Sequence, residues 1–262
     1  MTARPGLEVF DSHFHIIDRR FPLVANNGYS PAEFTVEHYR HRTRAMNVVA
    51  GAVVSGSFQA FDQNYLLAAL AALGPHFVGV TQLPVSASDA EILALHKAGV
   101  RALRFNLRRG GSHQLKTLGR MSRRVHELAG WHVELYVHGD DLPDLYVRLR
   151  ALPAISIDHL GLSAQGFPAL LELIERGARV KASGFGRVDF DVATALRAID
   201  AANPQALMFG TDLPSTRAPR VYSDQDLGLI VNTLGEARAA DVVYYNAVAL
   251  YRPGARPSAA MS

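Results

Sequence analysis

The chain of 262 residues contains no cysteine. This absence excludes disulfide bonds and thiolate ligands, so a metal ion would need nitrogen and oxygen ligands. The sequence also lacks an apolar run of the roughly 20 residues that a membrane-spanning helix needs. Residues 1–10 lack the long apolar core of a secretory signal. From these absences we expect a cytoplasmic protein that does not associate with membranes.

The charge is nearly balanced, whereas the apolar content is high. The chain has 27 basic and 24 acidic residues and a net charge of +3, which does not indicate a nucleic-acid partner. Hydrophobic residues make up 48% of the sequence, enough for a large buried core. We expect a globular protein, monomeric or a small homo-oligomer.

Short apolar segments alternate with helical segments along the chain. Strands are predicted at Leu7–Phe10, Val48–Val54, Phe77–Thr81, Val100–Phe105, His132–Val137, Ala154–Ile157, Ala178–Ala182 and Ala206–Gly210. Helices are predicted at Val36–Met46, Asn64–Leu73, Leu142–Leu149, Pro168–Arg176, Asp191–Ala201 and from Asp226 to Leu234. Ser88, with Glu91 three residues later, predicts the start of a further helix. After the fourth strand we expect a loop that carries Arg108 and Arg109, and then a helix that includes residues 121–128. A polar loop over residues 18–30 is too long for a simple connection, so we expect it to cover another part of the protein.

This alternation predicts an α/β fold, a (β/α)8 TIM barrel. The alternative is a doubly wound open sheet, which would need fewer strands or a Gly-rich first turn. We expect a single domain over residues 1–262, with a frayed Pro/Ala/Ser-rich tail at residues 253–262.

Two histidines follow the first predicted strand in the stretch Asp11-Ser12-His13-Phe14-His15. Side chains alternate along a strand with period two, so His13 and His15 point to the same side. Two neighbouring imidazoles can bind a metal ion or hydrogen-bond one polar oxygen. The motif alone leaves both roles open.

Further polar residues fall at the carboxyl ends of the predicted strands, where a TIM barrel builds its active site. They are Arg104, Asn106, Arg108, Arg109, Tyr136, His138, Asp158, His159, Lys181, Ser183, Arg187, Thr211 and Asp212. Arg104 lies inside a strand, where a charge is costly without a partner. We interpret His138 and the basic stretch 101–124, which includes His113, as structural or solvated.

The separated motifs together resemble the amidohydrolase superfamily. The motifs are D-x-H-x-H after the first strand, R-F-N on the fourth, D-H-x-G after the sixth, K-x-S-G on the seventh and G-T-D-x-P after the eighth. The resemblance runs from Val9 to Tyr251. Within the superfamily, the motifs resemble in particular the branch that contains 2-pyrone-4,6-dicarboxylate lactonase and sugar-acid lactonases.

The resemblance implies a hydrolase that opens a carboxylate-bearing lactone. Asp212 would activate a water as general base, while His13, His15 and His159 would stabilise the oxyanion. The residues that would bind the substrate's carboxylate are Tyr29, Arg104, Arg109, Tyr136 and Arg187. The partner would be a small anionic lactone.

The resemblance also bears on metal binding. Many members hold a divalent ion with the strand-one histidines, a strand-five histidine and the strand-eight aspartate, whereas this chain has Tyr136 on strand five. The lactonase with this arrangement needs no metal, so no metal is expected to be required. If one Zn²⁺ binds, its ligands would be His13, His15, His159 and Asp212.

Two departures from the family pattern concern the substrate. The dicarboxylate lactonase has an arginine where this chain has Leu162, and a histidine where it has Ser215. We therefore expect a monocarboxylate lactone, or a second acid placed differently. Two other functions remain open: a metal-dependent decarboxylase of the same superfamily, and a barrel without catalysis that serves as a binding subunit.

Overall fold

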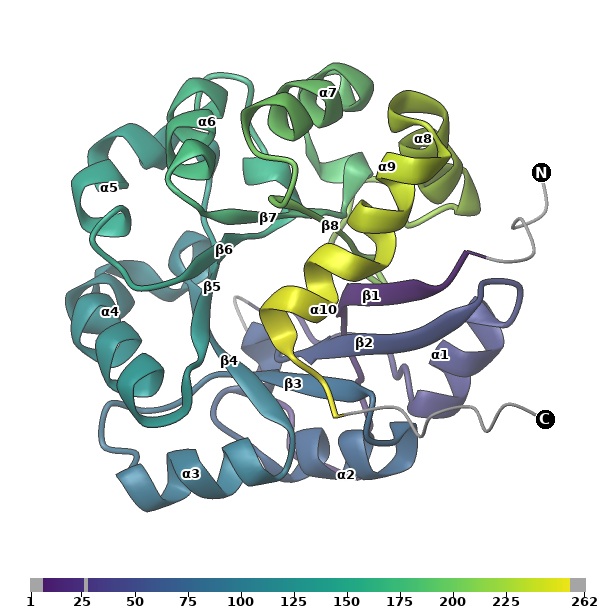
Figure 1. The fold of residues 1–262 in the computed structure, drawn as a ribbon. Coiled ribbons are helices and arrows are strands. Elements are labelled where there is room, and N and C mark those ends of the chain that lie inside the picture. The colour runs from purple at the N-terminus through teal and green to yellow at the C-terminus, as the bar shows by residue number, and fades with distance from the viewer. Residues whose placement is uncertain (1–6, 26–27, 255–262) are drawn as a thin grey trace.

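The computed structural model describes residues 7–25 and 28–254, without the side chains of residues 109–113. Eight parallel strands in sequence order form the inner ring, and helices surround it (Figure 1). The strands are β1 (Val9–Phe14), β2 (Val48–Val54), β3 (Phe77–Thr81), β4 (Val100–Asn106), β5 (His132–Tyr136), β6 (Ile155–Ile157), β7 (Arg179–Ala182) and β8 (Leu207–Phe209). The predicted (β/α)8 barrel is confirmed.

The helices occupy the connections between the strands and the C-terminal part of the chain. They are α1 (Val36–Thr43), α2 (Asn64–Leu73), α3 (Asp89–Lys97), α4 (Leu107–Ala129), α5 (Leu142–Leu149), α6 (Phe167–Glu175), α7 (Val192–Ala202), α8 (Asp224–Leu234), α9 (Glu236–Ala240) and α10 (Asn246–Tyr251). The predicted cap of α3 is present, since the Ser88 side chain accepts from the Glu91 amide and the Glu91 side chain accepts from the Ser88 amide.

The ring closes between β8 and β1 just beyond the end of β8. Phe14 and Leu213 form a parallel bridge there. The Asp212 amide donates to the His13 carbonyl (2.7 Å), and the His15 amide donates to the Leu213 carbonyl (2.7 Å). Closure therefore brings His13 and Asp212, 199 residues apart in sequence, into direct backbone contact.

Most predicted ends lie within three residues of the observed ones, but the end of β1 and the start of α4 differ by more. β1 begins at Val9 and continues to Phe14, with a register irregularity between Asp11 and Phe14, and a bulge of this kind re-aims side chains. α4 begins at Leu107, directly after β4, although the pair Gly110-Gly111 favours a loop. Glycine costs a helix only about 1 kcal/mol per residue, and α4 buries Leu118, Met121 and Val125 against the barrel.

The barrel interior has an apolar half and a charged half. An apolar cluster inside β1–β4 includes Phe10, Ala52, Val80 and Ala102. Across from it, Glu134 on β5 and Lys181 on β7 are both fully buried. Such charges are tolerated in an interior only when they pair with one another.

The two ends of the barrel differ. α10 lies across one end in Figure 1, where Asn246 donates to the carbonyls of Pro204 and Leu207 at the start of β8. Its Tyr251 stacks on Phe10 with ring centroids 5.3 Å apart. This end is the amino end of the strands, so the carboxyl ends open on the opposite side.

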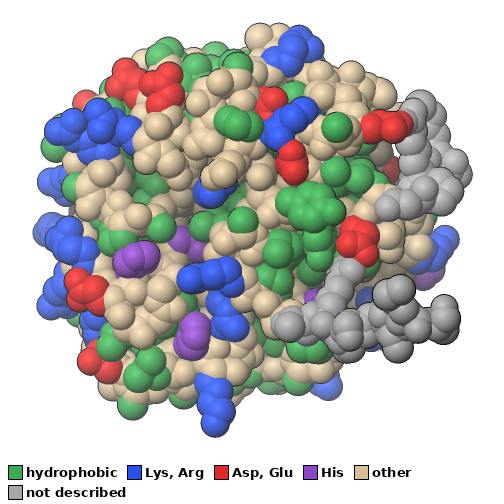
Figure 2. Space-filling model, in the orientation of Figure 1, with side chains coloured by type: hydrophobic (Ala, Val, Ile, Leu, Met, Phe, Trp, Pro, Cys, Tyr) green, Lys and Arg blue, Asp and Glu red, His purple; other side chains and the backbone are tan. Residues whose placement is uncertain are grey.

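The outer surface agrees with the interpretation of the later part of the basic stretch as solvated. Figure 2 shows Lys and Arg side chains along the edge of the molecule where α4 lies, and Lys116, Arg120 and Arg123 are exposed there. Within residues 7–25 and 28–254, none of the helices has the length and apolar character needed to cross a bilayer.

Candidate active site

A pocket of about 320 Å³ opens at the carboxyl ends of the strands. The lining residues are His15, Gly56, Ser57, Phe58, Arg104, Asn106, Tyr136, His159, Arg187, Asp212 and Thr216. Six of them were predicted as site residues from the sequence. The Val24 amide of the 18–30 loop donates to the Phe58 carbonyl (2.8 Å), so the part of this loop around residue 24 lies beside the pocket wall.

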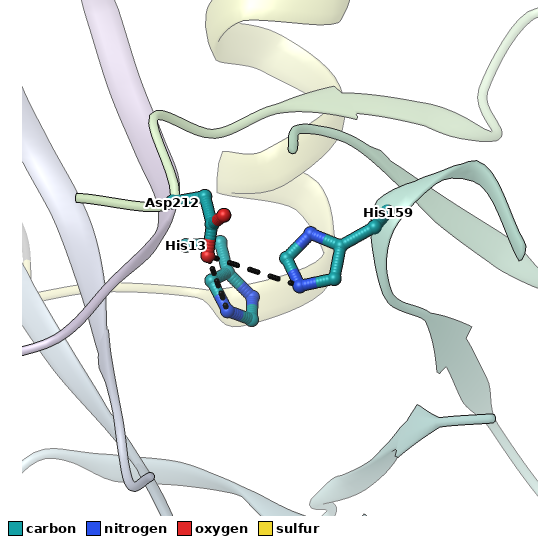
Figure 3. Close-up of side chains that lie close together, drawn as sticks. All are labelled: His13, His159 and Asp212. Atoms are coloured by element: carbon teal, nitrogen blue, oxygen red, sulfur yellow. Dashed lines mark ion pairs between the residues drawn. The ribbon is translucent and has the colours of Figure 1, made fainter. Parts of the chain in front are cut away.

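Asp212 faces two imidazole rings at the base of the pocket. Figure 3 shows its carboxylate directed toward both His13 and His159. Its Oδ1 lies 3.9 Å from His13 Nε2 and 3.8 Å from His159 Nε2. Both distances exceed a direct hydrogen bond, and neither Asp212 Oδ1 nor His13 Nε2 has a hydrogen-bond partner among the described residues. The three groups converge on one another without being paired.

Arg187 holds the other oxygen of Asp212. Its Nε donates to Asp212 Oδ2 (2.7 Å), and its Nη2 donates to the Thr216 carbonyl (2.9 Å). Burial opposes the charge of Arg187, but the Asp212 carboxylate raises the pKa of the guanidinium above its ordinary value. Asp212 also adopts the left-handed backbone conformation at φ +59°. Non-glycine residues in this conformation are strained and cluster at functional sites.

The hydrogen bonds of His15 and His159 differ. His15 Nδ1 lies 2.7 Å from the Val54 carbonyl, which only accepts, so Nδ1 carries the hydrogen and Nε2 keeps its lone pair. His159 Nδ1 lies 2.9 Å from Ser183 Oγ, which can donate or accept. Burial, and then the neighbouring His13, hold the pKa of both rings well below the ordinary value. Both rings are therefore neutral at physiological pH.

Arg104 and Tyr136 form one wall of the pocket. Arg104 donates from Nη2 to Asp158 Oδ2 (2.9 Å) and from Nη1 to the Ser55 carbonyl (2.6 Å). Its guanidinium lies 5.7 Å from the centre of the Tyr136 ring. Arg108 Nη1 donates to Tyr136 Oη (3.4 Å), so a second arginine reaches this wall from the first turn of α4.

Two predicted substrate-binding residues lie elsewhere or outside the described side chains. Tyr29 packs against Arg217, whose guanidinium lies 4.2 Å from the ring centre, and it is not one of the lining residues. Arg109 lies in α4, and its side chain is outside the described part of the structure. The role of each stays a prediction.

The expected zinc ligands do not converge as a set of four. Ligand atoms of His13, His159 and Asp212 lie within 4.8 Å of one another, and His15 is not in this group. Nδ1 of His13 lies 3.1 Å from the Lys181 ammonium, which opposes the free lone pair that a metal needs on Nε2. A second group is formed by His13, Glu134 and Asp158, but Lys181 Nζ already lies among them. Three of the four expected ligands therefore converge, and whether the protein requires a metal stays a prediction.

Two residues that contact the site had no role assigned from the sequence. Lys181 contacts His13, and Arg108 contacts Tyr136. Lys181 was part of a recognised motif, and its position inside a strand signals a paired charge. The sequence predicts a loop at Arg108, and the direction of a side chain in a loop is not predictable.

Comparisons with known proteins agree with the sequence motifs. A 2-pyrone-4,6-dicarboxylate hydrolase of Comamonas testosteroni is 33% identical over 160 residues, which cover 58% of this chain and 51% of that protein. The chain thus spans about half the length of this curated relative.

Solved structures share the fold over nearly the whole chain. A protein of Agrobacterium tumefaciens has 24% identity and a TM-score of 0.82, covering 95% of this chain and 97% of that one. A Pseudomonas putida protein, whose name proposes a 2-pyrone-4,6-dicarboxylic acid hydrolase, has 28% identity and a TM-score of 0.80, covering 94% and 98%. The amidohydrolase family model matches residues 10–252. The resemblance seen in the motifs is confirmed, and the chain belongs to the amidohydrolase family.

Proposed function

We propose that this protein is a hydrolase that opens a carboxylate-bearing lactone. The observation that carries the proposal is the unpaired Oδ1 of Asp212, which is 1% exposed and faces His13 and His159 beside a pocket with two arginines. The names of the Comamonas and Pseudomonas relatives support this substrate class for the family branch.

Asp212 is the general base of the proposed reaction. Arg187 occupies Oδ2, so Oδ1 is the oxygen left to take a proton from water. The water oxygen forms a bond to the lactone carbonyl carbon, and collapse of the tetrahedral intermediate breaks the ring C–O bond. The proton on Asp212 then passes to the leaving ring oxygen. General-base catalysis of this kind contributes about 10²–10⁴-fold in rate.

The histidines divide into donors and an acceptor. His13 and His159 direct Nε2 toward the space beside Asp212 Oδ1, where they donate to the developing oxyanion. Each positioned donor contributes about 3 kcal/mol. His15 differs from our expectation because its neutral ring, with Nδ1–H on Val54, has only a lone pair at Nε2. We assign it the role of accepting a hydrogen bond from the water or from a substrate hydroxyl.

The pocket favours a substrate with one carboxylate. Arg104 and Arg187 each use two guanidinium nitrogens on protein oxygens and keep the remaining hydrogens for a ligand. Neither position that departs from the dicarboxylate lactonase lines the pocket: Leu162 is buried, and Ser215 Oγ accepts from the Tyr222 amide (3.0 Å). These two positions therefore do not decide the substrate. Arg104 is already paired with Asp158 and Arg187 with Asp212, so the pocket carries little free positive charge, and on this ground we retain the monocarboxylate lactone as the proposed substrate.

A lactone panel tests the proposal. Pyrones, aldonolactones and muconolactones are incubated with the protein, with and without chelator, and ring opening is followed by acid release. Asp212→Asn should lose activity by about 10²–10⁴-fold, whereas Asp144→Asn, an exposed carboxylate on α5, should not. Unchanged hydrolysis by Asp212→Asn would refute the mechanism. Metal-dependent release of CO₂ in place of ring opening would refute the function.

A further inference from the structure

Lys181 lies at the centre of the charged half of the barrel. It is fully buried on β7, and its Nζ donates to Glu134 Oε2. The same atom lies 3.1 Å from His13 Nδ1 and 3.6 Å from Asp158 Oδ1. Glu134 Oε2 and His13 Nδ1 lie within hydrogen-bond distance of the ammonium group, and Asp158 Oδ1 lies just beyond it.

The contact with Lys181 determines which nitrogen of His13 carries the hydrogen. An ammonium group only donates, so His13 Nδ1 has to accept, and the single hydrogen of the neutral ring then lies on Nε2. Burial, and then the charge of Lys181, lower the pKa of His13, which keeps the ring neutral.

A competing arrangement is visible beside this contact. Asp158 Oδ1 lies 3.4 Å from His13 Nδ1 and has no hydrogen-bond partner among the described residues. In the absence of the lysine, Nδ1 would donate to this carboxylate. In a neutral ring the hydrogen would then leave Nε2, which would present a lone pair to the Asp212 carboxylate.

We propose that Lys181 is a positioning residue that holds His13 in the tautomer with its hydrogen on Nε2, directed at Asp212 Oδ1. The assignment deepens the proposed function, on which its catalytic consequence rests. The Nε2 hydrogen has no partner among the described groups, so it is available for the substrate oxygen. The same tautomer leaves His13 without a lone pair at Nε2, which makes it a donor and a poor metal ligand.

The experiment measures the tautomer directly. NMR of the full chain with ¹⁵N-labelled histidine assigns the protonated nitrogen of His13 in the wild type, in Lys181→Met and in Lys181→Met/Glu134→Gln. The double variant removes one cation and one anion, so it keeps the buried charge balanced if the single variant fails to fold. Lys116→Met, on the exposed face of α4, is the control.

We expect a hydrogen on Nε2 alone in the wild type and in Lys116→Met, and a hydrogen on Nδ1 in both Lys181 variants. The Lys181 variants should also lose about 10²–10³-fold in kcat and retain more Zn²⁺ after dialysis than the wild type. Nδ1–H in the wild type, or an unchanged tautomer in a folded Lys181 variant, would overturn the assignment. A tautomer change in a protein that opens no lactone would refute the proposed function alone, because the NMR measurement does not depend on activity.

Discussion

Gly184 provides a direct test of how closely the site is packed. It follows β7 at φ +59°, and a Cβ built on it would lie 2.7 Å from His159 Nδ1 and 2.9 Å from Arg187 Cδ. To reach an ordinary contact of about 3.5 Å, the imidazole would have to retreat by about 0.8 Å. Gly184→Ala therefore moves one proposed oxyanion donor and the arginine that holds the base.

The size of the effect follows from this displacement. A misplacement of about 1 Å costs up to about 10²-fold in rate, so kcat of Gly184→Ala for its lactone should fall by about 10–10²-fold. The left-handed backbone adds about 1–2 kcal/mol of strain for alanine. For a chain of this size, each kcal/mol lowers Tm by about 2–4 °C.

The matched control is Gly177→Ala. Gly177 also has a positive φ, +99°, but nothing lies within 4 Å of its built Cβ. Backbone strain should lower its Tm, while kcat stays near that of the wild type. Steady-state kinetics and thermal unfolding of both variants separate strain from displacement. If Gly184→Ala keeps wild-type kcat, or Gly177→Ala loses as much, the proposed contact with His159 does not control the site.

Two further predictions concern Asp11 and Arg187. Burial raises the pKa of Asp11 to about 6, against the opposing hydrogen bonds from Thr211 and other donors. Because the folded pKa lies above the unfolded value of about 3.9, the folded state retains the proton, and stability falls by about 3 kcal/mol as pH rises from about 4 to 6. Asp11→Asn lacks this titration. The unfolding free energy of the wild type minus that of the variant, measured by urea titration, should therefore fall between about pH 4 and 6. A difference that stays constant over this pH range would contradict the prediction. Arg187→Lys keeps the charge, but a lysine cannot bond to Asp212 Oδ2 and the Thr216 carbonyl through one planar group. The kcat/KM for an anionic lactone should therefore fall by about 10–10²-fold. Unchanged kinetics would remove Arg187 from the proposed site.

The barrel was predictable because its signal is repeated. Each apolar strand segment alternates with a helical one, so an error at one boundary leaves the count unchanged. The end of β1 was missed because Asp11 and Ser12 are polar. In the structure, Asp11 accepts from the amide (2.8 Å) and hydroxyl (2.6 Å) of Thr211, which makes a buried carboxylate compatible with a central strand. That partner is 200 residues away in sequence.

The site was predictable in its residue types and less so in its geometry. Six predicted residues line the pocket because the carboxyl ends of parallel strands meet at one end of a barrel. The position of each hydrogen depends on contacts that no local pattern encodes. His15 bonds to a carbonyl 39 residues away, and Lys181 to a carboxylate 47 residues away. These contacts separate two histidines that look equivalent in the sequence.

The charged half of the interior is better explained by the site than by stability. Glu134 and Lys181 are fully buried, and the desolvation of such a pair roughly cancels its attraction, so an intact buried pair contributes little to the free energy of folding. Removing one partner leaves an uncompensated charge, at a cost of about 3–5 kcal/mol. The network therefore favours one arrangement of these charged side chains over other arrangements, and it adds little to the free energy of folding. His13 Nδ1 contacts this network, and His13 Nε2 faces Asp212. The imidazole ring of His13 therefore connects the charged network to the proposed base.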